Sequence, residues 1–233
     1  MKTYIIEYHM SFTNHPQVIY SLEFDDQTAL LKNNTPANLP EWTKLEFKQC
    51  AHCPLSLEQH TYCPLAANLV NIITHFDALM SYDSLELKVV TEHRLVYKST
   101  TVQEALGAIL GLVIPTCGCP HTAYFRPMAR FHLPLASAEE TIYRATSMYL
   151  LAQYFRKKAG KDAELDFRGL KEIYKNMQIL NSATADRLRS ASKTDSSVNA
   201  VILLDMFTMV LPVAIEDSLT QLRGLFTSYL KND

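Results

Sequence analysis

At 233 residues, the chain is long enough to bury a sizeable core, so it does not need disulfides or a metal merely to fold. Hydrophobic residues make up 48% of the sequence and charged residues 20%, which excludes disorder across the whole chain. The net charge is −2, and no run of Lys and Arg is longer than residues 156–158, so the composition argues against a nucleic-acid-binding protein.

The sequence shows neither an export signal nor a convincing membrane span. Its N-terminal apolar run is broken at once by Glu7 and His9, unlike the long apolar core of a signal peptide. The longest apolar segment, residues 198–215, contains Asp205 and Pro212, and a carboxylate in mid-span is costly in lipid. We therefore expect a buried helix there, no membrane contact, and a cytoplasmic location in which thiols stay reduced.

The first half of the chain predicts mainly strands. Residues 4–12 and 17–24 are β-rich runs separated by a turn-like Thr-Asn-His-Pro cluster, which predicts a hairpin. Residues 42–47 end in an apolar–polar–apolar alternation and predict a half-buried strand that leads into Cys50. The other expected strands are residues 85–90 and 94–98.

Helical periodicity appears after residue 63 and dominates the second half. Apolar residues at three- and four-residue steps predict a helix from Pro64 to near Met80, and a second helix over residues 101–114 that Pro115 stops. A loop to residue 134 follows, and then Ser137 and Glu140 form a capping box that begins a helix. The helices expected beyond residue 136 are residues 137–158, 170–180, 198–215 and 216–230.

These elements predict an α+β fold, with N-terminal antiparallel strands, interspersed helices and a C-terminal helical bundle packed on them. We expect residues 1–135 to form the mixed part that carries the cysteines and residues 136–233 to form the bundle. The two parts are expected to make one compact unit.

The five cysteines fall in only two short segments of the chain. One segment holds Cys50 and Cys53 in a CxxC turn, followed by Cys63, and the other holds Cys117 and Cys119. A CxxC turn brings two sulfurs within reach of one ion, and four thiolates select zinc or an iron–sulfur cluster. Redox disulfides and inert buried thiols are the two alternatives.

We predict that the metal ligands are Cys50, Cys53, Cys63 and Cys119, with their sulfurs converging on one point. Cys117 is left over, and we expect it to lie against the end of the preceding helix. Three cysteines precede proline, a step that recurs among iron–sulfur ligands, whereas zinc is common in structural four-cysteine sites. Both cofactors, an iron–sulfur cluster and Zn2+, stay open.

Residues 49–69 (QCAHCPLSLEQHTYCPLAANL) and 119–134 (CPHTAYFRPMARFHLP) resemble segments of an uncharacterised bacterial family of unknown function. The resemblance leaves both ends of the chain uncovered. It implies an α+β bacterial protein and brings no activity.

Other polar residues are weaker candidates. His52, His60 and His121 flank the cysteines, but we expect them to lie outside the metal shell. Arg126, Arg130 and His132 lie on a proline-rich loop that could bind an anion, although pairing of the arginines with carboxylates is the simpler expectation. Asp205 requires a partner if it is buried, and the candidate partners are Arg187 and Arg189.

The first functional interpretation is an intracellular metal-binding protein of sensory, redox or accessory type. The second is an enzyme with a pocket at the loop of residues 126–132, although a metal held by four thiolates is coordinatively closed. The third is a protein-interaction module stiffened by zinc, which implies a protein partner. The sequence does not indicate an oligomeric state.

Overall fold

The computed structural model describes residues 2–76, 78–191, 195, 198–199, 201–202, 205 and 219–230. Its strands are β1 (Thr3–Phe12), β2 (Val18–Asp25), β3 (Ser84–Val90) and β4 (Leu95–Thr101). Its α-helices are α1 (Pro64–Phe76), α2 (Val102–Thr116), α3 (Arg126–Arg130), α4 (Ala138–Lys158), α5 (Arg168–Ala191) and α7 (Thr227–Leu230). Short 3₁₀ helices are η1 (Glu41–Thr43), η2 (Ala123–Phe125) and η3 (Arg223–Phe226). The fold is α+β, as predicted.

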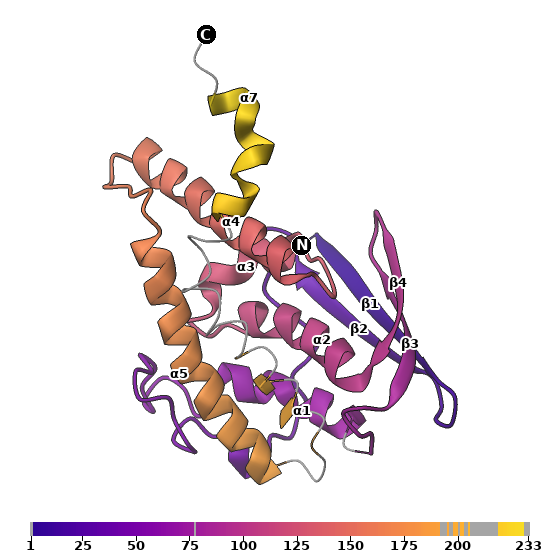
Figure 1. The fold of residues 1–233 in the computed structure, drawn as a ribbon. Coiled ribbons are helices and arrows are strands. Elements are labelled where there is room, and N and C mark those ends of the chain that lie inside the picture. The colour runs from indigo at the N-terminus through magenta and orange to yellow at the C-terminus, as the bar shows by residue number, and fades with distance from the viewer. Residues whose placement is uncertain are drawn as a thin grey trace.

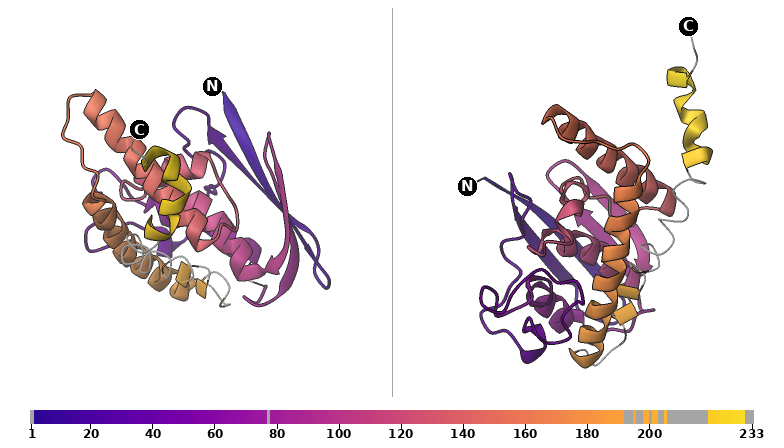
Figure 2. Two further views of the ribbon diagram at one scale, coloured as in Figure 1. Left: turned by 45° about the horizontal axis from the view of Figure 1, so that its top comes forward. Right: turned by 90° about the vertical axis from the view of Figure 1, so that its left-hand side faces the viewer.

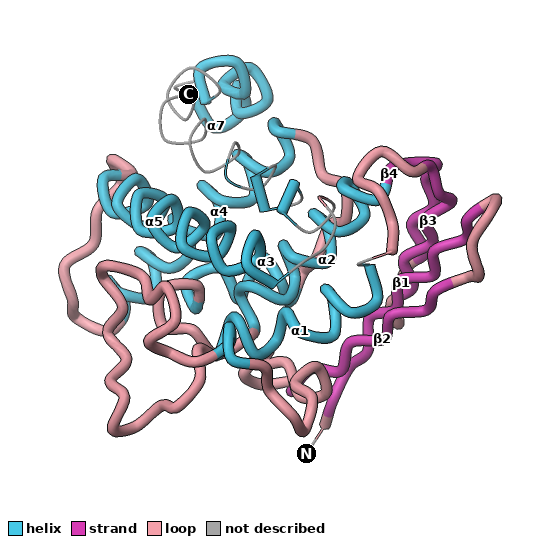
Figure 3. The backbone as a smooth tube through the Cα atoms, turned by 90° about the horizontal axis from the view of Figure 1, so that it is seen from below, coloured by secondary structure: helices cyan, strands magenta, loops and turns pink. Residues whose placement is uncertain are grey.

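The strands form a four-stranded antiparallel sheet in the order β2-β1-β3-β4. The predicted hairpin is confirmed, because β1 pairs with β2 from Thr3 opposite Asp25 onward. Alternate side chains of β1, such as Tyr8, are buried, whereas Ile5 between them is 50% exposed. The sheet therefore has one face toward the core, and Figures 1 and 3 show the helices gathered on that side.

Helix α2 lies directly on the inner face of the sheet, where the Tyr8 hydroxyl of β1 donates to the carbonyl of Ala108. Helix α1 lies beside it, and its His75 ring meets the ring of Tyr20 in β2 edge-on. One cluster of buried side chains extends from β1 to Leu188 in α5, so both predicted parts of the chain contribute to it. A division of the chain at residue 135 stays a prediction.

The second half contains the expected helices within the described residues. Ser137 and Glu140 form both hydrogen bonds of the capping box that begins α4, as predicted. Helix α5 is longer than predicted, because it continues from the expected end at residue 180 to Ala191. Buried Ala185 and Leu188 extend its apolar stripe through a stretch whose polar composition predicts a loop.

The strand predicted at residues 42–47 is wrong. The segment consists of η1 and turns, and only Lys44 joins an isolated bridge. Three of its carbonyl groups accept hydrogen bonds from the buried guanidinium of Arg187 in α5. The carbonyls that accept these hydrogen bonds are those of Trp42, Lys44 and Leu45. The Arg187 side chain thus donates the hydrogen bonds that a neighbouring strand would donate in a sheet.

Two further expectations are adjusted. Pro115 lies inside the last turn of α2, which ends one residue later, and the loop expected up to residue 134 contains η2 and α3. The helix expected at residues 198–215 lies mostly outside the described residues. Residues 219–222 are helical and are followed by η3 and α7, within the region predicted as the last helix.

In the described part of the chain, no helix combines the length and apolar character needed to cross a membrane.

Candidate functional site

The first cysteine segment is a long loop between η1 and α1. It begins with a turn in which the Cys53 N–H donates to the Cys50 carbonyl at 3.0 Å. It ends at Cys63, whose N–H donates to the Thr43 carbonyl at 2.9 Å and whose own carbonyl accepts from Ala67 in α1. Both ends of this cysteine loop are therefore fixed by backbone hydrogen bonds. Figure 2 shows α5 running alongside the loop.

The second cysteine segment follows the C-terminus of α2. The Cys117 thiol donates to the carbonyl of Ile114 at 3.1 Å, so this residue lies against the helix end, as expected. Gly118 then adopts a φ of +95°, which glycine adopts without strain, and turns the chain toward Cys119. A Cβ atom added to Gly118 would lie 3.8 Å from the Cβ of Pro64. The turn therefore rests on the first residue of α1.

The two cysteine segments, distant in sequence, are in contact. The His121 Nε2 atom donates to the carbonyl of His52 at 2.8 Å, and the two imidazole rings stack with centroids 3.9 Å apart. The His52 Nε2 atom in turn donates to the carbonyl of Asn176 in α5 at 3.1 Å. The Nδ1 atom of His52 is buried and finds no hydrogen-bond partner within the described residues. Its lone pair is thus free for a donor or a metal.

The thiols predicted as ligands influence one another's ionisation. Burial first, and then the thiols of Cys63, Cys53 and Cys119, raise the pKa of Cys50 to about 11, against the cation of Arg187. Burial also raises the pKa of Cys119, as do the thiols of Cys63 and Cys53. Cys50 and Cys119 thus share an environment in which the charged thiolate is disfavoured.

Cys119 and Cys117 differ in what their sulfur atoms do. Burial raises the pKa of Cys119, but the backbone N–H groups of His121 and Thr122 donate to its thiol and lower the pKa. The thiol of Cys117 instead donates its own proton to a carbonyl, which requires the protonated form. The backbone N–H of Cys119 and the hydroxyl of Thr122 also lower the pKa of Cys117, against the burial that raises it, so the choice of Cys119 over Cys117 as a ligand stays a prediction.

All five cysteines are free thiols. Among the residues that the structure describes, no group of three or more His, Cys, Asp or Glu side chains is arranged so that it could hold a metal ion. The ligand set of Cys50, Cys53, Cys63 and Cys119 stays a prediction.

A family model described as a domain of unknown function (DUF6901) matches residues 6–227. The chain belongs to this family. The match agrees with the expected family of unknown function and extends over both ends that the resemblance left uncovered. No curated protein and no solved structure matches the chain.

The two arginines of the proline-rich loop differ in their contacts in this DUF6901 domain. Arg130 pairs with Asp26 at 3.1 Å and lies over the ring of Tyr4 at 4.2 Å, in agreement with the simpler expectation. The buried Nε atom of Arg126 has no hydrogen-bond partner within the described residues. The arginines proposed as partners of Asp205 do not pair with it; this carboxylate accepts from the side chain of Asn181.

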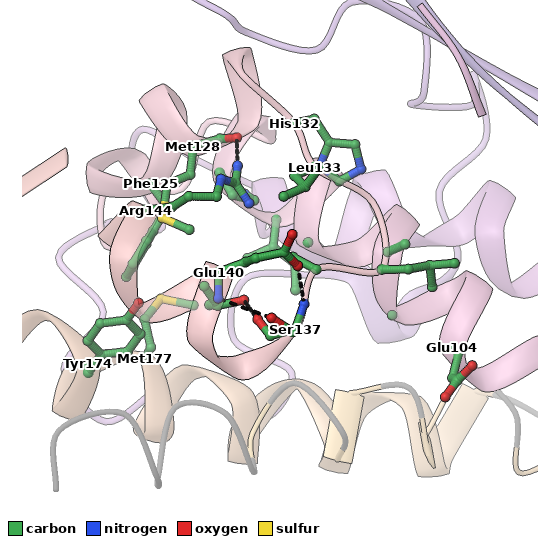
Figure 4. A pocket seen from close by; sticks show the side chains of 18 of the residues that line it. Glu104, Phe125, Met128, His132, Leu133, Ser137, Glu140, Arg144, Tyr174 and Met177 are labelled. Carbon is green, nitrogen blue, oxygen red and sulfur yellow. Dashed lines mark hydrogen bonds between the residues drawn. The ribbon is translucent and has the colours of Figure 1, made fainter. Parts of the chain in front are cut away.

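A cavity of about 520 Å³ lies beside this loop, between α2, α4 and α5 (Figure 4). Of the loop residues, Met128 and His132 line it, and Arg126 and Arg130 do not. Sequence reasoning missed the central polar residue of this cavity, Arg144. Arg144 follows Glu140 by four residues on one helix, a spacing typical of an exposed ion pair, so no local pattern indicates that it lines a cavity.

The stability of the protein is expected to fall at mildly acidic pH because of His132. Burial, together with the cation of Arg144, lowers the pKa of His132 to about 3, and its neutral ring donates from Nε2 to the oxygen of the buried Tyr8 hydroxyl at 2.5 Å. In the unfolded chain this imidazole takes up a proton near pH 6.5, so stability is lost as the pH falls from there toward 3, by up to about 1.4 kcal/mol per pH unit.

This pH dependence can be measured by urea unfolding at pH 7 and pH 4.5. Relative to the wild type, His132→Gln is expected to lose about 2 kcal/mol less stability between these two values, since glutamine does not titrate. His93→Gln is the matched control, because His93 is exposed and its loss should leave the pH dependence unchanged. An identical pH dependence in the wild type and His132→Gln would contradict the prediction.

Proposed function

We propose that the protein binds a thiophilic metal centre, zinc or an iron–sulfur cluster, on Cys50, Cys53, Cys63 and Cys119, in an intracellular sensory, redox or accessory role. The observation that carries the proposal is the contact between the cysteine loop and the segment after α2. The hydrogen bond from His121 to the His52 carbonyl joins them next to the cysteines. On this proposal, the cysteines of both segments contribute soft sulfur ligands to one metal centre.

The chemistry of the donor set supports a metal of this class. The two segments carry free thiols and no disulfide, and sulfur ligands select zinc and iron–sulfur clusters over hard cations, which prefer oxygen. Backbone N–H groups directed at the Cys119 thiol resemble the hydrogen bonds to sulfur that tune iron–sulfur potentials. Metal binding requires sulfurs within roughly 4 Å of one another, so on this proposal the cysteine side chains turn to a common point.

The proposal favours a structural or electron-transfer role for the metal over direct catalysis. Four protein thiolates complete a tetrahedral shell and leave no position for substrate. Their two segments come from the start of α1 and the end of α2, which both pack beneath the sheet. A metal there would fix the cysteine loop to the helical core, and its loss would release that loop.

The decisive experiment is anaerobic purification of the full chain with elemental analysis for iron and zinc. A brown protein containing iron and sulfide supports the cluster, and a colourless protein with about one zinc per chain supports the zinc site. A protein purified without either metal, which also fails to bind added Zn2+ under reducing conditions, would overturn the proposal.

A further inference from the structure

The cavity beside α3 has mostly apolar walls, formed by side chains of α2, the α3 region, α4 and α5. These include Ile114, Pro115, Phe125, Met128, Leu133 and Met177. Its volume of about 520 Å³ lies within the range of roughly 300 to 1,000 Å³ that is typical of small-molecule sites. Such a space suits the apolar body of a ligand, and its few polar groups would set the ligand's orientation.

Arg144 supplies a half-buried positive charge in the cavity (Figure 4), which the exposed Lys98 also lines. Its Nη2 atom donates to the carbonyls of Met128 at 2.7 Å and Phe131 at 2.9 Å, which hold the guanidinium in place. No carboxylate within the described residues forms an ion pair with it, and its Nε and Nη1 atoms have no partner there. Burial lowers the pKa of Arg144, so the cation is partly desolvated without a counter-ion. A bound anion would remove that cost.

The acidic side chain of Glu140 forms no ion pair with Arg144, although its charge acts on the guanidinium. The carboxylate of Glu140 raises the pKa of Arg144, but it is engaged in the capping box, where it accepts from the Ser137 N–H at 2.7 Å. Glu104 also lines the cavity and accepts from the Thr100 hydroxyl. These two carboxylates would repel a dianion such as a phosphate monoester, and they leave room for a single negative charge.

Tyr174 adds a second donor on the facing helix, α5. Its side chain is buried, and its hydroxyl has no hydrogen-bond partner among the described residues. Burial raises the pKa of Tyr174, and the cation of Arg144 acts against that rise. Both side chains line the same cavity. A guanidinium and a hydroxyl that both donate can together bind the two oxygens of a carboxylate.

We propose that this cavity binds a small molecule with an apolar body and one carboxylate, such as a medium-chain fatty acid. Arg144 pairs with the carboxylate, the Tyr174 hydroxyl donates the second hydrogen bond, and the apolar chain lies against the walls formed by α2 and the α3 region. None of the five cysteines lines this cavity, so the proposal does not depend on a metal at the cysteines.

The proposal is tested by calorimetric titration of the full chain with decanoate and with decanol, which share the apolar chain and differ in the charged head. Decanoate is expected to bind at least about tenfold more tightly than decanol. Arg144→Gln should weaken decanoate binding about tenfold and leave decanol unchanged, which removes the difference. Arg156→Gln, an exposed arginine on the same helix, is the matched control and should bind both ligands as the wild type does.

A second variant keeps the test decisive if Arg144→Gln folds poorly. Gly111 lines the cavity, and a Cβ added to it would meet nothing within 4 Å, so Gly111→Leu should fill the space without a clash. Leucine is also the better helix former, so the melting temperature should not fall. Loss of decanoate binding in this folded variant supports the cavity as the site. Equal binding of decanoate and decanol, binding unaffected by Gly111→Leu, or no binding at all would overturn the proposal.

Discussion

Replacing Arg187 with methionine is expected to lower the free energy of unfolding by about 3–5 kcal/mol. Arg187 is 4% exposed, and it donates to three carbonyls of the segment before the cysteine loop at distances of 2.8, 2.8 and 3.0 Å. Methionine keeps most of the volume but donates no hydrogen bond, so three carbonyls lose a charged donor. For a chain of this length the loss corresponds to a decrease of roughly 10 °C in melting temperature.

Arg189→Met is the control for this prediction. Arg189 lies on the same helix but pairs with Asp186 at the exposed surface, where an ion pair contributes at most about 1 kcal/mol. Its replacement should therefore leave the denaturation curve nearly unchanged. A loss of less than about 1 kcal/mol in Arg187→Met would mean that the three carbonyls find other partners, water included, and that Arg187 does not hold the segment.

Elements whose signals are local could be predicted from the sequence. The hairpin follows from two alternating runs around a turn cluster, and the pairing of Thr3 with Asp25 matches it. The start of α4 follows from Ser137 and Glu140, whose capping bonds involve only neighbouring residues. The signals for these elements lie within a few residues, so no knowledge of tertiary contacts is needed.

Elements that depend on distant side chains could not be predicted. Thr43 and Leu45 are buried with the alternation of a strand, yet this segment joins no strand of the sheet and forms only an isolated bridge between Lys44 and Tyr62. The donors come from Arg187, and nothing in the local sequence indicates that a remote arginine satisfies these carbonyls. The predicted end of α5 at residue 180 is too early for a similar reason, because Ala185 and Leu188 pack into the core through tertiary contacts.

The candidate site was predictable only in part. The cysteine count and spacing indicated that the segment with Cys63 and the segment with Cys119 meet, and the contact between His52 and His121 places them together. The cavity could not be predicted, because its walls come from four elements whose packing the sequence does not specify. The amphipathic stripe of α5 identified Tyr174 as buried, without showing that its hydroxyl faces a cavity.

The remaining large effect is expected at the cysteines, and it rests on the proposed metal function. Cys119→Ala should abolish metal binding, so that the metal content falls from about one centre per chain to nearly none. The backbone N–H groups of His121 and Thr122 donate hydrogen bonds to its sulfur, and these bonds favour the thiolate that a metal requires. Cys117→Ala should retain the metal, because the Cys117 thiol is engaged as a donor to the Ile114 carbonyl. Elemental analysis of both variants, purified anaerobically in parallel, measures the difference.

The two alanine variants control for each other, since both remove a buried thiol from the same short segment and differ only in the predicted ligand role. Cys63→Ser should reduce metal content and melting temperature together, because metal binding adds to the free energy of folding. The core is large enough that the metal-free variants should still fold. If Cys117→Ala contained no metal and Cys119→Ala retained the metal, the assignment of the fourth ligand would be wrong. If both variants kept the metal, the site could not include the segment after α2, and a metal held by the cysteine loop alone would have to replace it.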